Sequence, residues 1–142
     1  QGWQVWLFGS KKDHAVAEQI RGRLIPGLRE EATNLCGDTS LAQAIDLLSC
    51  ADAVVSNDSG LMHVASALNR PLVAVYGSTS PGFTPPLADR VETLQLGLEC
   101  SPCFDRTCRF GHYNCLRDLM PAQVNAALER LVGNPLSDPQ DG

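Results

Sequence analysis

Short apolar runs alternate along most of the chain with stretches that carry apolar residues at helical spacing. The run over 5–8 ends in Gly-Ser, and apolar residues recur with helical period over 13–24. The same order returns with a weak strand over 33–36 and a helix after Ser40, whose Ser-x-x-Gln start is typical of a capping box. The pattern therefore predicts two successive strand-helix units.

A third unit follows directly. An apolar run over 53–56 is typical of a buried strand, an Ala-rich helix is expected over 61–68, and another strand over 71–76. Strands that alternate with helices through short loops predict a parallel sheet with helices on both faces. The fold class expected is therefore α/β, in three layers.

The pattern changes after residue 76. Turn-forming residues fill 77–86 and predict a long loop, after which an alternating run predicts a strand over 91–96. Pro121 is suited to the first turn of a helix that continues over 122–132. We expect one domain over 1–133 and a frayed tail over 134–142.

Composition excludes several classes of function. Acidic residues outnumber basic ones by 16 to 11 and the basic residues are scattered, which disfavours binding to nucleic acid. No apolar run approaches the roughly 20 residues of a transmembrane helix, and the start lacks a signal-peptide pattern, so we expect a cytoplasmic domain. The chain begins without Met and enters a strand within a few residues, which suggests a fragment of a longer enzyme.

In parallel sheets of this type, ligands bind outside the carboxyl ends of the strands. Four strand-to-helix junctions are small and polar: Gly9-Ser10-Lys11, Gly37-Asp38-Thr39-Ser40, Asn57-Asp58-Ser59-Gly60 and Gly77-Ser78-Thr79. A helix start offers unpaired N–H groups and a partial positive charge, and glycine lets the backbone approach a ligand closely. The junction over 57–60 is therefore the strongest candidate for an anion-binding loop.

Two residues of this junction have competing interpretations. Asp58 either caps the helix and does nothing else, or also contacts the ligand. His63 follows Ser59 by four residues, so its imidazole is expected on the face of the helix that carries the loop. The alternative for His63 is a partly buried histidine whose hydrogen bonds are satisfied within the protein.

Common nucleotide and hydrolase motifs are missing from the sequence. There is no P-loop and no G-x-G-x-x-G after a strand. The Gly37-Asp38-Thr39-Ser40 segment faintly resembles the Gly-Asp-Ser-Leu start of some esterases, but Thr39 replaces their nucleophile and no D-x-x-H motif follows. Hydrolase chemistry is therefore disfavoured.

Several segments together resemble the heptosyltransferase II type of glycosyltransferase family 9, which uses ADP-heptose to build lipopolysaccharide in bacteria. The likeness spans nearly the whole chain and is carried by Leu7-Phe8-Gly9-Ser10, Asn34-Leu35-Cys36-Gly37, Asn57-Asp58-Ser59-Gly60-Leu61-Met62-His63, Asn69-Arg70-Pro71 and Thr84-Pro85-Pro86. It implies a GT-B glycosyltransferase with two facing Rossmann-like domains. This chain would be the C-terminal half, which binds the nucleotide sugar.

The resemblance also implies a role for particular residues. Asp58 would bind heptose hydroxyls, the amides of Ser59 and Gly60 would hold the pyrophosphate, and His63 would lie near the phosphates. Adenine would lie against the 37–39 junction, while Ser10 and Lys11 would lie near the ribose. The donor-binding set implied is Lys11, Thr39, Asp58, Ser59, Gly60 and His63.

The reaction implied is transfer of heptose from ADP-heptose to the lipopolysaccharide inner core with inversion, at the cytoplasmic face of the inner membrane. A carboxylate of the other domain would be the general base, so no catalytic residue is expected in this chain and no cofactor is required for catalysis. We expect these 142 residues alone to bind donor without transferring it. Two alternatives stay open, a stand-alone binding module for a phosphorylated ligand and another GT-B nucleotide-sugar enzyme such as an epimerase.

Four cysteines are concentrated near the end of the chain, at Cys100, Cys103, Cys108 and Cys115. Thiolates at such spacing can hold a structural Zn²⁺, and His112 could replace one of them. Reduced cysteines without a metal are an equal alternative, and disulfides are disfavoured in a cytoplasm. Cys36 and Cys50 stand apart in the sequence, and we expect both to be small buried hydrophobic residues.

Overall fold

The structure is a computed structural model that describes residues 2–133, and these form two compact units. The first unit extends to Leu47 and the second runs from Leu48 to Gly133, so the boundary falls near the end of one helix. Each unit is described by itself. The tail predicted over 134–142 lies outside the described residues, and the single domain expected over 1–133 stays a prediction.

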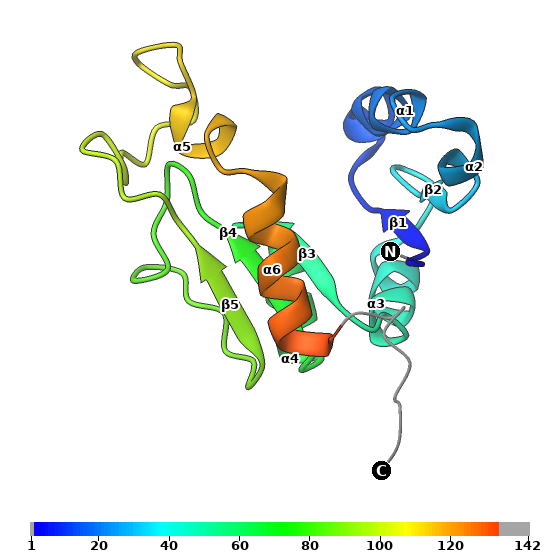
Figure 1. Cartoon of the computed structure of the whole chain (residues 1–142). Helices are drawn as coiled ribbons and strands as arrows, with labels where there is room; N and C mark the ends of the chain where they lie inside the picture. The colour runs from blue at the N-terminus through cyan, green and yellow to red at the C-terminus, as the bar shows by residue number, and fades with distance from the viewer. Residues whose placement is uncertain (1, 134–142) are drawn as a thin grey trace. The chain divides into compact units, whose positions relative to one another are not determined.

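The first unit is built on a pair of parallel strands joined by helical segments (Figure 1). Val5 lies opposite Ala32 in this pair, and the side chain of Arg21 donates a hydrogen bond to the carbonyl of Ala32. The elements of this part are β1 (Val5–Leu7), the 3-10 helix η1 (Lys11–Asp13), α1 (His14–Gly22), α2 (Pro26–Arg29), β2 (Ala32–Asn34) and α3 (Leu41–Ser49).

The predicted start of α3 is confirmed. The backbone N–H of Ser40 donates to the side chain of Gln43 over 2.9 Å, and the N–H of Gln43 donates to the hydroxyl of Ser40 over 3.2 Å. This reciprocal pair satisfies two N–H groups that a helix start would otherwise leave without partners.

The second unit contains a sheet of three parallel strands in the order β3-β4-β5. Its elements are β3 (Val54–Asn57), α4 (Gly60–Ala67), β4 (Leu72–Val75), β5 (Val91–Leu94), α5 (Asn114–Arg117) and α6 (Pro121–Val132). Parallel strands and intervening helices confirm the predicted α/β class. Pro121 is the first residue of α6, as the sequence predicts.

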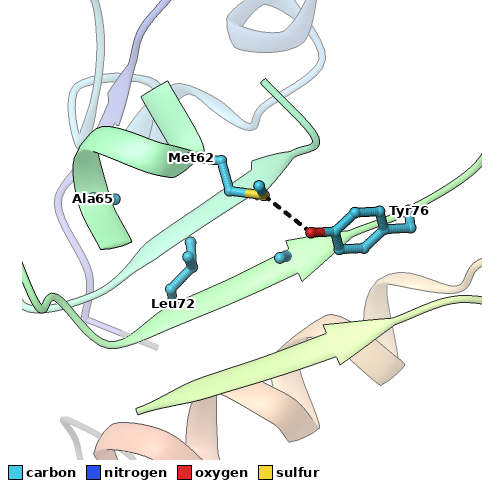
Figure 2. Packing of buried hydrophobic residues seen from close by; sticks show 5 residues of the cluster. Met62, Ala65, Leu72 and Tyr76 are labelled. Atoms are coloured by element: carbon cyan, nitrogen blue, oxygen red, sulfur yellow. Dashed lines mark hydrogen bonds between the residues drawn. The ribbon is translucent and has the colours of Figure 1, made fainter. Parts of the chain in front are cut away.

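The central strand β4 is buried on both faces. Leu72 and Tyr76 lie against Met62 and Ala65 of α4, as Figure 2 shows, and Ala74 belongs to the same buried cluster. Val73 alternates with these residues along the strand, so it faces the other side of the sheet, and it is equally buried. The helix α6 packs against β4, and its Ala127 is fully buried. Burial on both faces explains the nearly continuous apolar sequence of this strand.

Three local predictions differ from the structure. The weak strand expected over 33–36 is β2 over 32–34, and the short helices α2 and α5 have no counterpart among the predicted elements. Cys36 is buried as expected, but Cys50 is exposed because it follows the end of α3, where the chain turns toward β3. No helix in the described part of the chain is both long and apolar enough to cross a membrane.

Candidate functional site

The predicted ligand loop lies where β3 ends and α4 begins. Asn57 is the last residue of β3, and Gly60 is the first residue of α4. Ser59 has extended backbone angles and its hydroxyl accepts a hydrogen bond from the N–H of Met62 over 3.4 Å. Ser59 is therefore the helix cap, and the interpretation of Asp58 as only a cap is wrong.

The carboxylate of Asp58 is instead held by a side chain that lies far along the sequence. Thr84 donates from its hydroxyl to Oδ2 of Asp58 over 2.9 Å. The other oxygen, Oδ1, lies 4.0 Å from Nε2 of His63. The Asp58 side chain is only 15% exposed, so its direction is fixed by these neighbours while one oxygen keeps room to accept further hydrogen bonds.

The surface beside Asp58 is open at the backbone. A Cβ atom added to Gly60 would meet no other atom within 4 Å, so a ligand can approach the first turn of α4. His63 is 49% exposed, and its N–H donates to the carbonyl of Ser59 over 3.4 Å, one helical turn away. The helix start, a carboxylate oxygen and an imidazole thus lie together at the carboxyl edge of this sheet.

Thr84 is positioned by the long loop that follows β4. The hydroxyl of Tyr76 donates to the carbonyl of Thr84 over 2.6 Å, and the N–H of Leu87 donates to the buried hydroxyl of Ser66 over 2.6 Å. Burial raises the pKa of the Tyr76 phenol, and the negative charge of Asp58 raises it further. Tyr76 therefore stays a neutral donor that fixes the loop.

Sequence reasoning gave Thr84 no role. Its bond to Asp58 joins residues 26 positions apart, and nothing in the local pattern around Thr84 separates it from the other hydroxyl residues of the loop. The sequence offers two hints: the loop follows a strand neighbouring the one that ends just before Asp58, and Thr84-Pro85-Pro86 is among the segments that carry the family resemblance.

The other two junctions, which belong to the first unit, pack closely on one another. The N–H of Gly37 donates to the carbonyl of Gly9 over 3.1 Å. A Cβ atom added to Gly37 would come within 2.7 Å of the Cα atom of Lys11, so only glycine allows this approach. Lys11 and Thr39 therefore belong to adjoining loops, with Lys11 exposed and Thr39 half-buried.

Ser10 is occupied within its own turn. Its hydroxyl and its N–H both donate to Oδ2 of Asp13, over 2.8 and 2.7 Å. These hydrogen bonds lower the pKa of the Asp13 carboxyl. Ser10 and Lys11 are the two residues expected near the ribose. The Ser10 side chain is hydrogen-bonded to Asp13, whereas the Lys11 side chain is exposed and has no such bond within the turn.

Three of the four clustered cysteines lie between β5 and α5 and the fourth, Cys115, lies in α5; all four line one cavity of about 120 Å³ together with His112. All four are free thiols. Within residues 2–133, no three His, Cys, Asp or Glu side chains are arranged so that they could hold a metal ion. The predicted metal ligands therefore line one cavity, but they are not at coordination distance from a common point.

The thiols of this cluster differ in their surroundings. The backbone N–H groups of Tyr113, Phe110, His112 and Gly111 lower the pKa of Cys108. Burial raises the pKa of Cys115, and the neighbouring Cys100, Cys103 and Cys108 raise it further. The cluster therefore contains one thiol whose pKa is lowered and one whose pKa is raised.

Comparison with known proteins gives a consistent set of relatives. A family model described as "Glycosyltransferase family 9 (heptosyltransferase)" matches residues 1–114. The chain is 55% identical over 96 residues to lipooligosaccharide heptosyltransferase 2 of Haemophilus influenzae, covering 68% of the chain and 28% of that protein. It is 42% identical over 132 residues to lipopolysaccharide heptosyltransferase 2 of Escherichia coli, covering 93% of the chain and 38% of that protein.

A solved structure agrees with these relatives. The structure of E. coli ADP-heptose lps heptosyltransferase II superposes with a TM-score of 0.80 at 43% identity, covering 92% of this chain and 37% of that one. The chain therefore spans 28% to 38% of the length of the curated relatives described above.

Proposed function

The chain belongs to glycosyltransferase family 9, the heptosyltransferases, and from this premise we propose that it is the part of a heptosyltransferase that binds ADP-heptose. The observation that carries the proposal is the arrangement at the start of α4. An open helix start lies beside a largely buried carboxylate and an exposed imidazole. A nucleotide sugar offers a pyrophosphate for the helix start and hydroxyls for the carboxylate.

Charge decides which part of the donor each residue binds. The N–H groups of Ser59 and Gly60 lie at the positive end of α4 and suit the pyrophosphate. Asp58 would repel a phosphate, but its free Oδ1 can accept hydrogen bonds from heptose hydroxyls. His63, 4.0 Å from Asp58, lies between the two and in its protonated form would favour the phosphate side.

The family resemblance also implies contacts for the nucleoside end of the donor. We propose that Thr39 contacts adenine through its backbone and that Lys11 lies near the ribose. The close packing of Gly37 on Lys11 supports this pairing, because it makes the two loops one surface. A ligand on that surface would contact both residues at once.

The reaction proposed for the full-length enzyme is inverting transfer of heptose from ADP-heptose to the inner core of lipopolysaccharide. The acceptor hydroxyl must lose its proton as it attacks the sugar, and we assign this general base to residues outside the chain. The acceptor would lie on the cytoplasmic face of the inner membrane, and residues outside the chain would hold it as well.

Amide NMR spectra of the purified chain test the donor site. Addition of ADP-heptose should shift the amide signals of Ser59, Gly60 and His63 and those of the 37–39 junction. ADP alone should reproduce the shifts at the 37–39 junction. UDP should shift the junction less, because uracil differs from adenine in size and hydrogen-bonding pattern. Shifts elsewhere only, or equal shifts with UDP, would contradict the proposal.

Activity of the chain alone is a separate test. The purified 142-residue chain should transfer no heptose to a lipopolysaccharide acceptor even where it binds donor. Mass spectrometry of the acceptor detects any transfer of heptose. Transfer by this chain would show that the general base lies within the chain.

A further inference from the structure

The cysteine cluster is not among the residues proposed to bind donor, yet its four members line one cavity. The four sulfurs approach the cavity from two directions, since Cys100, Cys103 and Cys108 lie in the loop after β5 and Cys115 lies in the first turn of α5. Bringing four thiols to one space requires the chain to fold back on itself over this segment. A structural reason for such a gathering is an ion that the thiols share.

Cys108 lies at the start of a tight turn. The N–H of Gly111 donates to the carbonyl of Cys108 over 3.0 Å, and Gly111 has a positive φ of 72°. This turn follows the loop that carries Cys100 and Cys103, and all three cysteines line the cavity that Cys115 reaches from α5.

His112 is excluded as a ligand by its own hydrogen bond. Its Nδ1 accepts from the N–H of Asn114 over 3.0 Å, so the ring proton of the neutral imidazole sits on Nε2. The ring is also stacked on Phe110, with a centroid distance of 5.6 Å. Neither nitrogen then has a free lone pair for a metal, and the fourth ligand must be a thiol.

We propose that Cys100, Cys103, Cys108 and Cys115 bind one zinc ion in a tetrahedral site made of four thiolates. The sulfurs are not at coordination distance in this structure, so binding requires them to move closer together across the cavity. Each thiol releases its proton to solvent when its sulfur bonds to the ion. Arg106, Arg109 and Asp105 line the same cavity, and Arg109 is paired with Asp105 over 2.8 Å, so these three side chains leave one positive charge to offset part of the net negative charge of the loaded site.

The site has a structural role that reaches toward the ligand loop. The hydroxyl of Ser101 donates to the carbonyl of Gly77, and the N–H of Phe104 donates to the carbonyl of Ser78 over 2.7 Å. Residues 77–78 begin the long loop that carries Thr84, the partner of Asp58. Zinc would therefore fix the segment on which this loop rests, without contacting donor.

Metal analysis of the purified protein tests the proposal directly. Inductively coupled plasma mass spectrometry should find about one zinc per chain, as a single four-ligand site requires. Cys108→Ser and Cys115→Ser should each lose most of it. Two controls should keep it, namely Cys50→Ser at the exposed cysteine outside the cluster and His112→Gln at the excluded ligand.

A second measurement keeps the test independent of whether those variants fold. Wild-type protein stripped of metal and loaded with cobalt(II) should show the visible absorption bands of tetrahedral thiolate coordination. Wild-type protein that contains no metal and shows no such bands would overturn the proposal, as would a disulfide within the cluster or loss of zinc in His112→Gln. These outcomes leave the donor site untouched, because they do not involve Asp58 or α4.

Discussion

The junctions after β2 and after β3 both end a parallel strand, but different forces hold them in shape. At 37–39 the loop is fixed by backbone contact, with Gly37 pressed against Lys11 and bonded to Gly9. At 57–60 it is fixed by side chains, with Asp58 bonded to Thr84 and Ser59 bonded to the start of α4. The backbone of Gly60 has open space around it.

The contrast indicates which substitutions each junction tolerates. A side chain added at 37 must displace backbone, while one added at 60 displaces only solvent or ligand. Loss of a polar side chain should matter more at 57–60 than at 37–39. Each expectation can be measured on its own unit.

The largest effect on stability should come from Gly37→Ala. Its φ of +79° is unfavourable for any residue with a Cβ, and that Cβ would lie 2.7 Å from the Cα of Lys11. Together these should cost about 2–4 kcal/mol of the free energy of unfolding. Urea unfolding measures the loss, with Gly22→Ala in α1 as control because an added Cβ there meets nothing within 4 Å. Equal stability of Gly37→Ala and Gly22→Ala would contradict the view that close backbone contact holds the 37–39 junction in shape.

Thr84→Val should have the next largest effect. The substitution keeps the shape of the side chain but removes the hydroxyl that donates to Asp58 over 2.9 Å. Loss of a hydrogen bond to a carboxylate that is mostly buried should cost roughly 1.5–3 kcal/mol of stability. Thr84→Ser, which keeps the hydroxyl, should restore most of it in the same urea experiment. No difference between the Val and Ser variants would mean that Asp58 is positioned by something else.

Gly60→Ala should separate folding from binding. Because the added methyl meets no atom and alanine favours helix, stability should hold or rise by up to about 1 kcal/mol. The methyl would stand where the pyrophosphate approaches, so affinity for ADP-heptose should fall several-fold in a calorimetric titration. Gly22→Ala again serves as control. Unchanged affinity in Gly60→Ala would place the phosphates elsewhere.

The smallest effect concerns acid stability of the first unit. Hydrogen bonds from Ser10 lower the pKa of Asp13 below its ordinary 3.8, and those from Asn34 and Arg21 lower the pKa of Glu18 below 4.5. A carboxyl with a lowered pKa in the folded state stabilises the protein above its ordinary pKa, and this stability disappears as pH falls through the lowered value.

Amide signals of α1 should therefore begin to lose protection from hydrogen exchange only below about pH 4.5, the ordinary value of Glu18. In Glu18→Gln this contribution is absent, so its stability should change less between pH 5 and pH 3, estimated as a window around these carboxyl pKa values. An acid loss as steep in Glu18→Gln as in the wild-type protein would show that Glu18 makes no contribution.

Much of the fold could be predicted because its pattern is local. The apolar run of β4, the capping box at Ser40 and Pro121 at the start of α6 each act within a few residues, and all appear in the structure. Short elements such as α5 were missed because four residues carry too little periodicity.

The candidate site could be located from sequence but not fully resolved. The position of 57–60 after a buried strand predicts a ligand loop, whereas the partner that holds the Asp58 carboxylate is Thr84, which lies 26 residues beyond Asp58. A contact of that range is set by packing of the loop on Tyr76, which no local rule describes.

The central claim is that Asp58 binds the heptose of ADP-heptose and that the start of α4 binds its pyrophosphate. Calorimetric titration of the purified chain with ADP-heptose, beside Asp58→Ala and the control Asp52→Ala at an exposed carboxylate, tests it most directly. We expect binding by the wild-type chain and by Asp52→Ala, and affinity at least tenfold weaker in Asp58→Ala, about 1.4 kcal/mol or more. Equal affinity in the wild-type chain and Asp58→Ala, or no binding by any of the three, would contradict the account.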